Sequence, residues 1–248
     1  MRLAAILVHA AWRIGRGSIV AANRYTGAER AAARSRTPAA QRVIRGTSMI
    51  AGIIVVAVAY LVGSISFAMV ASRVFGLPDP HDYGSGNPGA SNVLRTGHRK
   101  AALVTLVGDG IKGFVVVEAA ILIAAAMALP GFVVPAAALA VFLGHLFPVY
   151  YGFRGGKGVA TAAGIVFALN WPVGLVLAIV WLTLAFGFKI SSLAGLVAAA
   201  LMPLGMFYEL GAVPVTFVMV VIAVLVFWRH RENIRKLVRG DERVIGRE

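Results

Sequence analysis

Long apolar segments alternate with short polar ones along most of this chain, and this alternation restricts the fold more than any other feature. Seven apolar segments can be recognised, and several approach the ~20 residues that a helix needs to cross a bilayer. They cover residues 49–70, 101–129, 131–150, 158–171, 173–188, 190–208 and 212–228. Only 14% of the residues are charged and the mean hydropathy is +0.83, whereas soluble domains carry about 25% charge. The sequence therefore predicts an all-α, polytopic integral membrane protein with about seven transmembrane helices.

The fourth and fifth apolar segments are short for membrane spans. They cover residues 158–171 and 173–188, and a tilted, partly buried or re-entrant arrangement would suit them as well as a full crossing. A count of five or six spans therefore stays open beside the count of seven.

Lysine and arginine are distributed unevenly among the polar segments. If all seven apolar segments cross the membrane, fourteen basic residues lie on one side of it. They are found in the loops at 71–100, 151–157 and 188–190 and in the tail from 229. The connections on the opposite side hold no basic residue, and Glu209 is their charged residue. Because short loops rich in Lys and Arg stay in the cytoplasm, we expect the C-terminus inside and the N-terminus of the membrane core outside.

The first 47 residues differ in composition from the rest. They carry nine arginines, no lysine and one acidic residue, Glu29. A basic N-terminal extension and a leader read from a misassigned start are the two interpretations. We favour the second, because Met49 stands at the very start of the first apolar segment and because nine arginines outside would conflict with the charge rule. The chain is thus divided into residues 1–47 and a membrane-embedded domain, residues 48–248.

Charge and composition exclude several kinds of function. A net charge of +14 could indicate nucleic-acid binding in a soluble protein, but here the basic residues lie between apolar segments, which is typical of a membrane surface. The chain has no cysteine, so disulfides and thiol chemistry are excluded. The five histidines are scattered without the spacing of a metal site. We expect no metal, no cofactor and no nucleic acid.

The segment 83–97, YGSGNPGASNVLRTG, contains four glycines, one proline and two asparagines, so a regular helix is not expected here. At membrane depth such a segment has to be buried in protein or line a wet cavity. Glycine N–H groups can approach an anion closely, and an arginine binds phosphate through two parallel hydrogen bonds. A solvated loop is the alternative. The candidate residues are Gly84, Ser85, Gly86, Asn87, Ser91, Asn92 and Arg95.

The segment 152–161, GFRGGKGVAT, resembles a nucleotide-binding phosphate loop at first sight. That motif needs a glycine where Tyr151 stands and Ser or Thr where Gly158 stands, so the match fails. Because the segment leads directly into an apolar helix, its N–H groups still form a potential anion site at a helix N-terminus. A glycine turn with a lysine placed by the charge rule is the alternative. The candidate residues are Gly155, Gly156, Lys157 and Gly158.

Two further segments carry polar residues of interest. In GDGIKG, Asp109 and Lys112 are three residues apart inside an apolar segment; ionisable residues there are functional candidates, and a structural ion pair that locks helices together is the alternative. The basic amphipathic stretch 229–242 is expected to lie on the membrane surface. Its His230 and Asn233 would share one helix face.

Several of these segments together resemble the bacterial acyl-phosphate:glycerol-3-phosphate acyltransferase family, over residues 49–248. The matching stretches are GSISFAMVASRVFG at 63–76, GSGNPGASNVLRTG at 84–97, DGIKG at 109–113, GHLFPVYYGFRGGKGVAT at 144–161 and RHRENIRKLVRGDE at 229–242. They occur in the order and spacing of the family. The departures are mild, since the family pattern has Thr at Ser91, Pro at Ser66 and often Lys at Arg154.

The resemblance implies a seven-helix enzyme of the bacterial cytoplasmic membrane with its active site facing the cytoplasm. Such an enzyme transfers a fatty acyl group from acyl phosphate to the 1-hydroxyl of glycerol 3-phosphate, and it releases lysophosphatidate and phosphate in phospholipid synthesis. Carried over to this chain, the catalytic residues would be Ser85, Arg95, Lys157, His230 and Asn233. The expected partners are the two substrates, the bilayer and, by contact, the soluble enzyme that makes acyl phosphate. A multipass carrier of phosphorylated metabolites is the rival interpretation.

Overall fold

The computed structural model describes residues 38–244, and all regular secondary structure in this range is helical. Most of the predicted extension, residues 1–47, lies outside the described residues; residues 38–47 form the start of the first described helix. The helices are α2 (Pro38–Gly63), α3 (Phe67–Val74), α4 (Ala90–Leu94), α5 (Arg99–Ala126), α6 (Val133–Leu146), the short 3₁₀ helix η1 (Val149–Tyr151), α7 (Val159–Leu169), α8 (Trp171–Gly187), α9 (Ser191–Leu210), α10 (Pro214–Arg229) and α11 (Arg231–Arg239).

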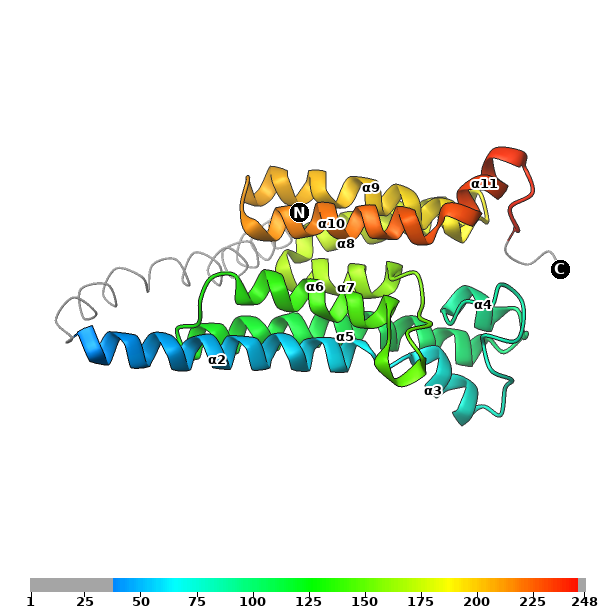
Figure 1. Cartoon of the computed structure of the whole chain (residues 1–248). Coiled ribbons are helices and arrows are strands. Elements are labelled where there is room, and N and C mark those ends of the chain that lie inside the picture. The colour runs from blue at the N-terminus through cyan, green and yellow to red at the C-terminus, as the bar shows by residue number, and fades with distance from the viewer. Residues whose placement is uncertain (1–37, 245–248) are drawn as a thin grey trace, which may run out of the picture.

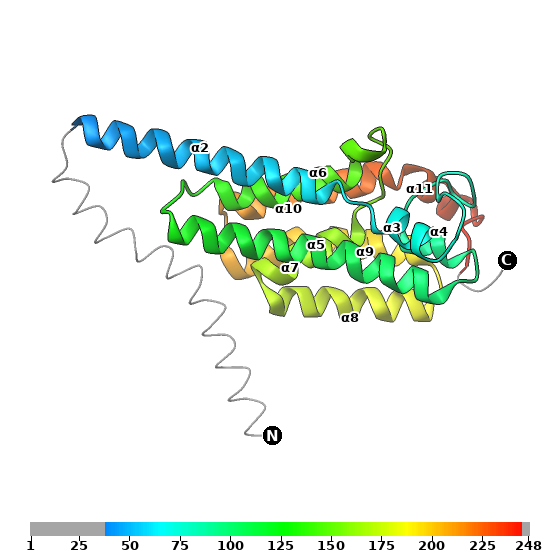
Figure 2. The same ribbon diagram turned by 90° about the horizontal axis from the view of Figure 1, so that it is seen from below.

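The seven apolar helices α2 and α5 to α10 run side by side as a bundle (Figures 1 and 2). Within it, α2 packs on α6, α5 on α7, α8 on α9, and α9 on α10. The short helices α3, α4 and α11 gather at one end of the bundle, where the figures show them together. We call this the polar end, because it carries the segments 83–97 and 229–242.

Glycines allow the helix backbones to approach closely. A side chain at Gly63 of α2 would overlap the Val141 carbonyl of α6, and one at Gly144 of α6 would overlap the Tyr60 carbonyl of α2. A side chain at Gly164 of α7 would likewise overlap the Gly110 carbonyl of α5. Small residues at helix crossings are the usual way in which membrane helices gain packing without a hydrophobic driving force.

The outside of the bundle is apolar, as expected for contact with lipid. Large apolar side chains such as Phe186 and Leu204 are 77% and 65% exposed. Among the described residues, Gly46–Gly63, Val133–Tyr151 and Ser191–Leu210 are long and apolar enough to cross a membrane. The α10 and α11 pair, bent by 59°, would add a fourth. The fold is thus all-helical with several apolar helices of membrane-spanning character.

The first apolar segment, predicted as one unit over residues 49–70, is divided in the structure. Helix α2 ends at Gly63, and α3 begins at Phe67 after Ser66, whose hydroxyl accepts a hydrogen bond from the Met69 N–H. A serine in this position satisfies a free N–H group and favours a new helix start. The prediction of an uninterrupted segment was wrong because this capping signal outweighed the apolar composition.

The fourth apolar segment forms α7, which has only eleven residues. At 1.5 Å per residue it rises about 16 Å, roughly half the thickness of the hydrocarbon core. Asn170 ends α7 and caps α8 by accepting a hydrogen bond from the Val173 N–H at 3.1 Å. The two short segments therefore form a tight helical pair within the bundle.

Candidate active site

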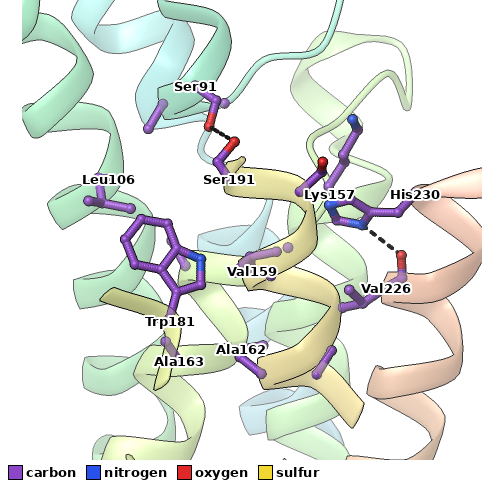
Figure 3. A pocket seen from close by; sticks show the side chains of 18 of the residues that line it. Ser91, Leu106, Lys157, Val159, Ala162, Ala163, Trp181, Ser191, Val226 and His230 are labelled. Carbon is purple, nitrogen blue, oxygen red and sulfur yellow. Dashed lines mark hydrogen bonds between the residues drawn. The ribbon is translucent and has the colours of Figure 1, made fainter. Parts of the chain in front are cut away.

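A cavity of about 370 Å³ extends from the polar end into the bundle (Figure 3). Its deeper part is apolar and is lined by Leu106 of α5, Val159 of α7, Trp181 of α8 and Met202 of α9. Ten of the fifteen site residues predicted from the sequence also line it: Ser85, Asn87, Ser91, Asn92, Arg95, Asp109, Lys157, Gly158, His230 and Asn233. The cavity thus brings together segments that are far apart in the sequence.

The side chain of Asn92 organises the first predicted segment. Its Oδ1 accepts hydrogen bonds from the Ser85 N–H at 2.8 Å, the Ser85 hydroxyl at 3.2 Å and the Arg95 guanidinium at 3.4 Å. Its Nδ2 donates to the carbonyl oxygens of Pro80 at 2.9 Å and Tyr83 at 3.2 Å. Because Asn92 is buried and both its polar atoms are engaged, it holds Ser85 and Arg95 in place at the cavity wall.

Part of the first segment is helical, contrary to the expectation of no regular helix. Residues 90–94, ASNVL, form the one-turn helix α4. A helix is possible here because Gly89 precedes this stretch and the stretch itself contains no glycine or proline. Gly84 and Gly86 have φ values of +62° and +64°, and they do not line the cavity. A glycine is needed at such angles, so these two residues shape the turn that carries Ser85.

The glycine-rich loop is held by Arg229, a residue that the sequence indicates only as a charge on the cytoplasmic side. Its Nη2 donates to the Gly155 carbonyl at 2.6 Å and its Nε to the Gly156 carbonyl at 3.1 Å. Neither glycine lines the cavity. A side chain on Gly155 would overlap the His145 carbonyl, and one on Gly156 would overlap the His145 ring. These glycines fit the loop against the bundle so that Lys157 reaches the cavity.

Lys157 is the cation at the N-terminus of α7. Its Nζ donates to the Asn233 Oδ1 at 2.5 Å. Burial, together with the positive charges of Arg229 and Arg95, lowers the pKa of Lys157 to about 8, although Glu242 opposes the shift. A desolvated cation beside Arg95 is an energetically costly arrangement in the absence of an anion, and it indicates a site for negative charge.

His230 occupies the bend between α10 and α11 and points into the cavity beside Lys157 (Figure 3). Its Nδ1 lies 2.8 Å from the Val226 carbonyl oxygen, which can only accept, so Nδ1 carries the proton. Burial and, to a smaller extent, the charge of Lys157 lower the pKa of His230 to about 4, despite the hydrogen bond to Val226. At neutral pH the ring is uncharged, and Nε2 presents a lone pair.

Asn233 is held by Glu242, and Glu242 is held in turn by Ser192; neither residue was predicted from the sequence. Glu242 Oε1 accepts a hydrogen bond from the Asn233 Nδ2 at 2.6 Å and another from the Ser192 hydroxyl at 2.6 Å. Glu242 also lines the cavity. Ser192 and Glu242 are fifty residues apart, and no local pattern predicts such a contact. Together they fix the amide so that its oxygen faces Lys157.

Asp109 and Lys112 form a buried ion pair at 2.8 Å within α5. The Lys112 ammonium group also donates to the Ile65 carbonyl at 2.7 Å and contacts the His145 Nδ1 at 2.9 Å. The Thr161 hydroxyl of α7 donates to the Asp109 carbonyl at 3.0 Å. Asp109 reaches the cavity wall, whereas Lys112 does not. The pair therefore connects α5 with α6, α7 and the segment before α3. This is the arrangement of a structural ion pair that locks helices together, one of the two interpretations of the sequence.

The arrangement suits an anion that carries a long apolar group. Arg95 and Lys157 supply positive charge at the polar end of the cavity, and His230 supplies a neutral acceptor. The deeper part is lined by apolar side chains between the helices. A phosphate bearing a fatty chain would match both parts.

Comparison with known proteins agrees with this chemistry. The family profile described as glycerol-3-phosphate acyltransferase matches residues 53–240. The chain belongs to this family. A glycerol-3-phosphate acyltransferase of Cupriavidus pinatubonensis is 54% identical over 190 residues, which cover 76% of this chain and 93% of that protein. One from Neisseria gonorrhoeae is 49% identical over 191 residues, which cover 77% and 96%.

Two solved structures of an integral membrane glycerol 3-phosphate acyltransferase, PlsY, share this fold. Its glycerol 3-phosphate form has a TM-score of 0.73 and its lysophosphatidic acid form one of 0.72. Each is 38% identical and covers 79% of this chain and 96% of the PlsY chain. In this chain the Ser91 hydroxyl donates to the Ser191 hydroxyl at 3.1 Å and so links α4 to α9.

Proposed function

We propose that this protein transfers a fatty acyl group from an acyl phosphate to the 1-hydroxyl of glycerol 3-phosphate. The hydroxyl oxygen attacks the acyl carbon, the bond from that carbon to the phosphate oxygen breaks, and lysophosphatidate and inorganic phosphate leave. The observation that carries the proposal is a continuous cavity, in which Arg95 and Lys157 stand at one end and apolar side chains line the other. Both substrates carry phosphate, and the donor also carries a fatty chain.

Positioning and charge neutralisation would provide most of the rate enhancement. Arg95 can bind a phosphate through two hydrogen bonds, and Lys157 adds a point charge at the start of a helix. Bringing the acceptor hydroxyl and the acyl carbon together removes much of the entropic part of the barrier. Because phosphate is already a good leaving group, only a modest proton acceptor is required.

We assign the proton to a substrate phosphate oxygen. The pKa of His230, lowered to about 4 by burial, is far below that of an efficient general base at neutral pH. With Nδ1 fixed on the Val226 carbonyl, Nε2 can instead accept a hydrogen bond from the glycerol hydroxyl and orient it. In this account His230 is a positioning group, and Ser85 and Asn233 complete the polar contacts.

Replacement of His230 by glutamine tests this assignment. We expect the Michaelis constant for glycerol 3-phosphate to rise about tenfold and kcat to fall less than about threefold, because a positioning contact is lost and the proton acceptor is not. Steady-state rates over a range of both substrates separate the two constants. A loss of kcat by about 10³ at an unchanged Michaelis constant would instead identify His230 as the base.

The proposal also places the protein in the bacterial cytoplasmic membrane, with α2 and α5 to α10 as its seven membrane helices, of which α7 is too short to cross the hydrocarbon core alone, and with the polar end facing the cytoplasm. The gathering of α3, α4 and α11 at one end of the bundle supports it (Figures 1 and 2), as does the basic charge of the segments there. Contact of this basic surface with the soluble enzyme that makes acyl phosphate stays a prediction.

Single cysteines report the orientation directly, since the natural chain has none. Ala212, between α9 and α10, and Arg239, at the end of α11, are exposed and lie at opposite ends of α10. We expect an impermeant maleimide to label Ala212→Cys in intact spheroplasts and Arg239→Cys only after lysis. Labelling of Arg239→Cys before lysis would reverse the proposed orientation.

The activity itself is tested with purified protein in lipid nanodiscs. Given palmitoyl phosphate and glycerol 3-phosphate, it should form lysophosphatidate and inorganic phosphate in equal amounts. Release of phosphate without lysophosphatidate would show hydrolysis of the donor, which the proposal does not predict.

A further inference from the structure

His81 joins the two loops that carry the candidate phosphate-binding cations. It lies in the loop before Ser85, and its side chain is 10% exposed. The ring Nδ1 is 2.7 Å from the Asp79 carboxylate, and the ring Nε2 is 2.9 Å from the Arg154 carbonyl oxygen. Arg154 immediately precedes Gly155 in the glycine-rich loop. The imidazole thus spans from its own loop to the loop of Lys157.

Both partners of this ring are hydrogen-bond acceptors. A peptide carbonyl has no proton to donate. Burial raises the pKa of Asp79, but hydrogen bonds from the backbone N–H and the ring of His81 outweigh burial, and the net pKa is lowered. Asp79 is therefore ionised at neutral pH and also only accepts. Both bonds can form together only when both ring nitrogens carry a proton, that is, when His81 is an imidazolium ion.

The bridge connects the two halves of the cavity wall. On one side, the carbonyls of Pro80 and Tyr83, which flank His81, accept the hydrogen bonds of the Asn92 amide. The same amide holds Ser85 and Arg95 through its oxygen.

On the other side, the three consecutive carbonyls of Arg154, Gly155 and Gly156 are all bound by side chains. His81 binds the first, and Arg229 binds the second and third. These bonds fix the backbone that leads into Lys157. His81 therefore joins the half of the site that contains Arg95 to the half that contains Lys157.

We propose that His81, as an imidazolium ion, is a positioning residue that sets the separation of the Arg95 and Lys157 loops for binding a substrate phosphate. The expected effect on catalysis rests on the proposed function, whereas the hydrogen bonds of His81 do not depend on that function. The charged side chains on the two segments that meet here are Asp79, Asp82 and Arg95 on the first and Arg154 and Lys157 on the second. Loss of the ring proton would leave at least one acceptor without a donor and loosen the bridge.

Two substitutions separate charge from shape. In His81→Gln the side chain is neutral and cannot span both acceptors with two donors, so we expect the Michaelis constant for glycerol 3-phosphate to rise about tenfold while kcat changes less than about threefold. In His81→Arg a permanent cation with several N–H donors replaces the ring, so we expect affinity close to that of the natural protein. Asp79→Asn, which removes the counter-charge, should resemble His81→Gln.

The split between the Michaelis constant and kcat gives a readout that a purely structural role would not change. A residue that only stabilises the fold alters the amount of active protein, whereas a positioning residue raises the Michaelis constant of the active fraction. We expect a raised Michaelis constant in His81→Gln and its recovery in His81→Arg. An unchanged Michaelis constant in His81→Gln, or an equal rise in His81→Arg, would overturn the inference.

Nitrogen-15 NMR of histidine-labelled protein tests the bridge without relying on activity. The His81 ring, identified by its disappearance in His81→Gln, should show both nitrogens protonated, as its two hydrogen-bond acceptors require. A neutral ring with a single protonated nitrogen would overturn the inference. If the protein formed no lysophosphatidate, the proposed function would fail while this measurement still tested the bridge.

Discussion

Lys157→Met is expected to lower kcat/KM for glycerol 3-phosphate by about 10²–10³, the range found when a preorganised electrostatic contact is removed from an active site. Lys157 lines the cavity at the N-terminus of α7, where Asn233 holds its ammonium group. Methionine keeps the length and apolar stem of the side chain and removes the charge.

Lys100→Met is a matched control for this loss. Lys100 also lies at a helix N-terminus, that of α5, but it is exposed and does not line the cavity. We expect its rate constants to change less than about twofold, as for an ordinary surface substitution. Equal losses in the two variants would show that general charge near the membrane, and not the cavity, determines the rate.

The pH dependence follows from the same residue. Only the protonated form of Lys157 carries the charge that binds phosphate, and burial lowers its pKa to about 8. Activity is therefore present below this pH and is lost as pH rises through it, so kcat/KM should fall about fivefold between pH 8 and 9. Lys157→Arg should remove this fall, because a guanidinium group stays protonated in this range.

Lys112→Met is expected to have the largest effect on stability. It leaves the Asp109 carboxylate buried without its partner at 2.8 Å and the Ile65 carbonyl without a donor. Breaking a buried pair in this way costs about 3–5 kcal/mol, which corresponds to a fall in the thermal midpoint of roughly 10 °C for a chain of this size. The measurement is thermal unfolding of detergent-solubilised protein.

The double variant Asp109→Asn/Lys112→Met shows whether the unpaired charge is the cause. Removing both charges costs less than removing one, so the midpoint of the double variant should lie above that of Lys112→Met. If it lay below, or if Lys112→Met unfolded like the natural protein, the ion pair would not hold α5 in the bundle.

Much of the helical arrangement follows from composition. Apolar segments of membrane length leave few alternatives to helices, because every backbone polar group has to be satisfied within the segment. The interruption at Gly63–Ser66 was missed, since an apolar average over 49–70 hides a single capping serine. The extent of α2 upstream of Met49, to Pro38, was also outside the prediction.

The candidate site was predictable in its residue types and less so in their contacts. Glycines, Arg95 and Lys157 in polar loops indicate an anion site by their chemistry alone. The contacts of Arg229 with the glycine-rich loop and of Glu242 with Ser192 join residues separated by fifty or more positions. Such contacts depend on how the helices pack, and no local spacing encodes them.

The glycines of the glycine-rich loop have two different roles, and the sequence does not show which glycine has which role. Gly158 lines the cavity, whereas Gly155 is required by close contact with the His145 carbonyl. Which role applies is decided by the neighbouring helix α6, about which the motif GFRGGKGVAT carries no information.

The most direct measurement is the choice of acyl donor by membranes that contain this protein. Labelled glycerol 3-phosphate would be supplied with palmitoyl phosphate or with palmitoyl-CoA, and Arg95→Ala would be compared with the natural chain under both conditions. We expect lysophosphatidate from palmitoyl phosphate alone, and its loss in Arg95→Ala. Equal product from palmitoyl-CoA, or no product from either donor with correctly inserted protein, would contradict this expectation.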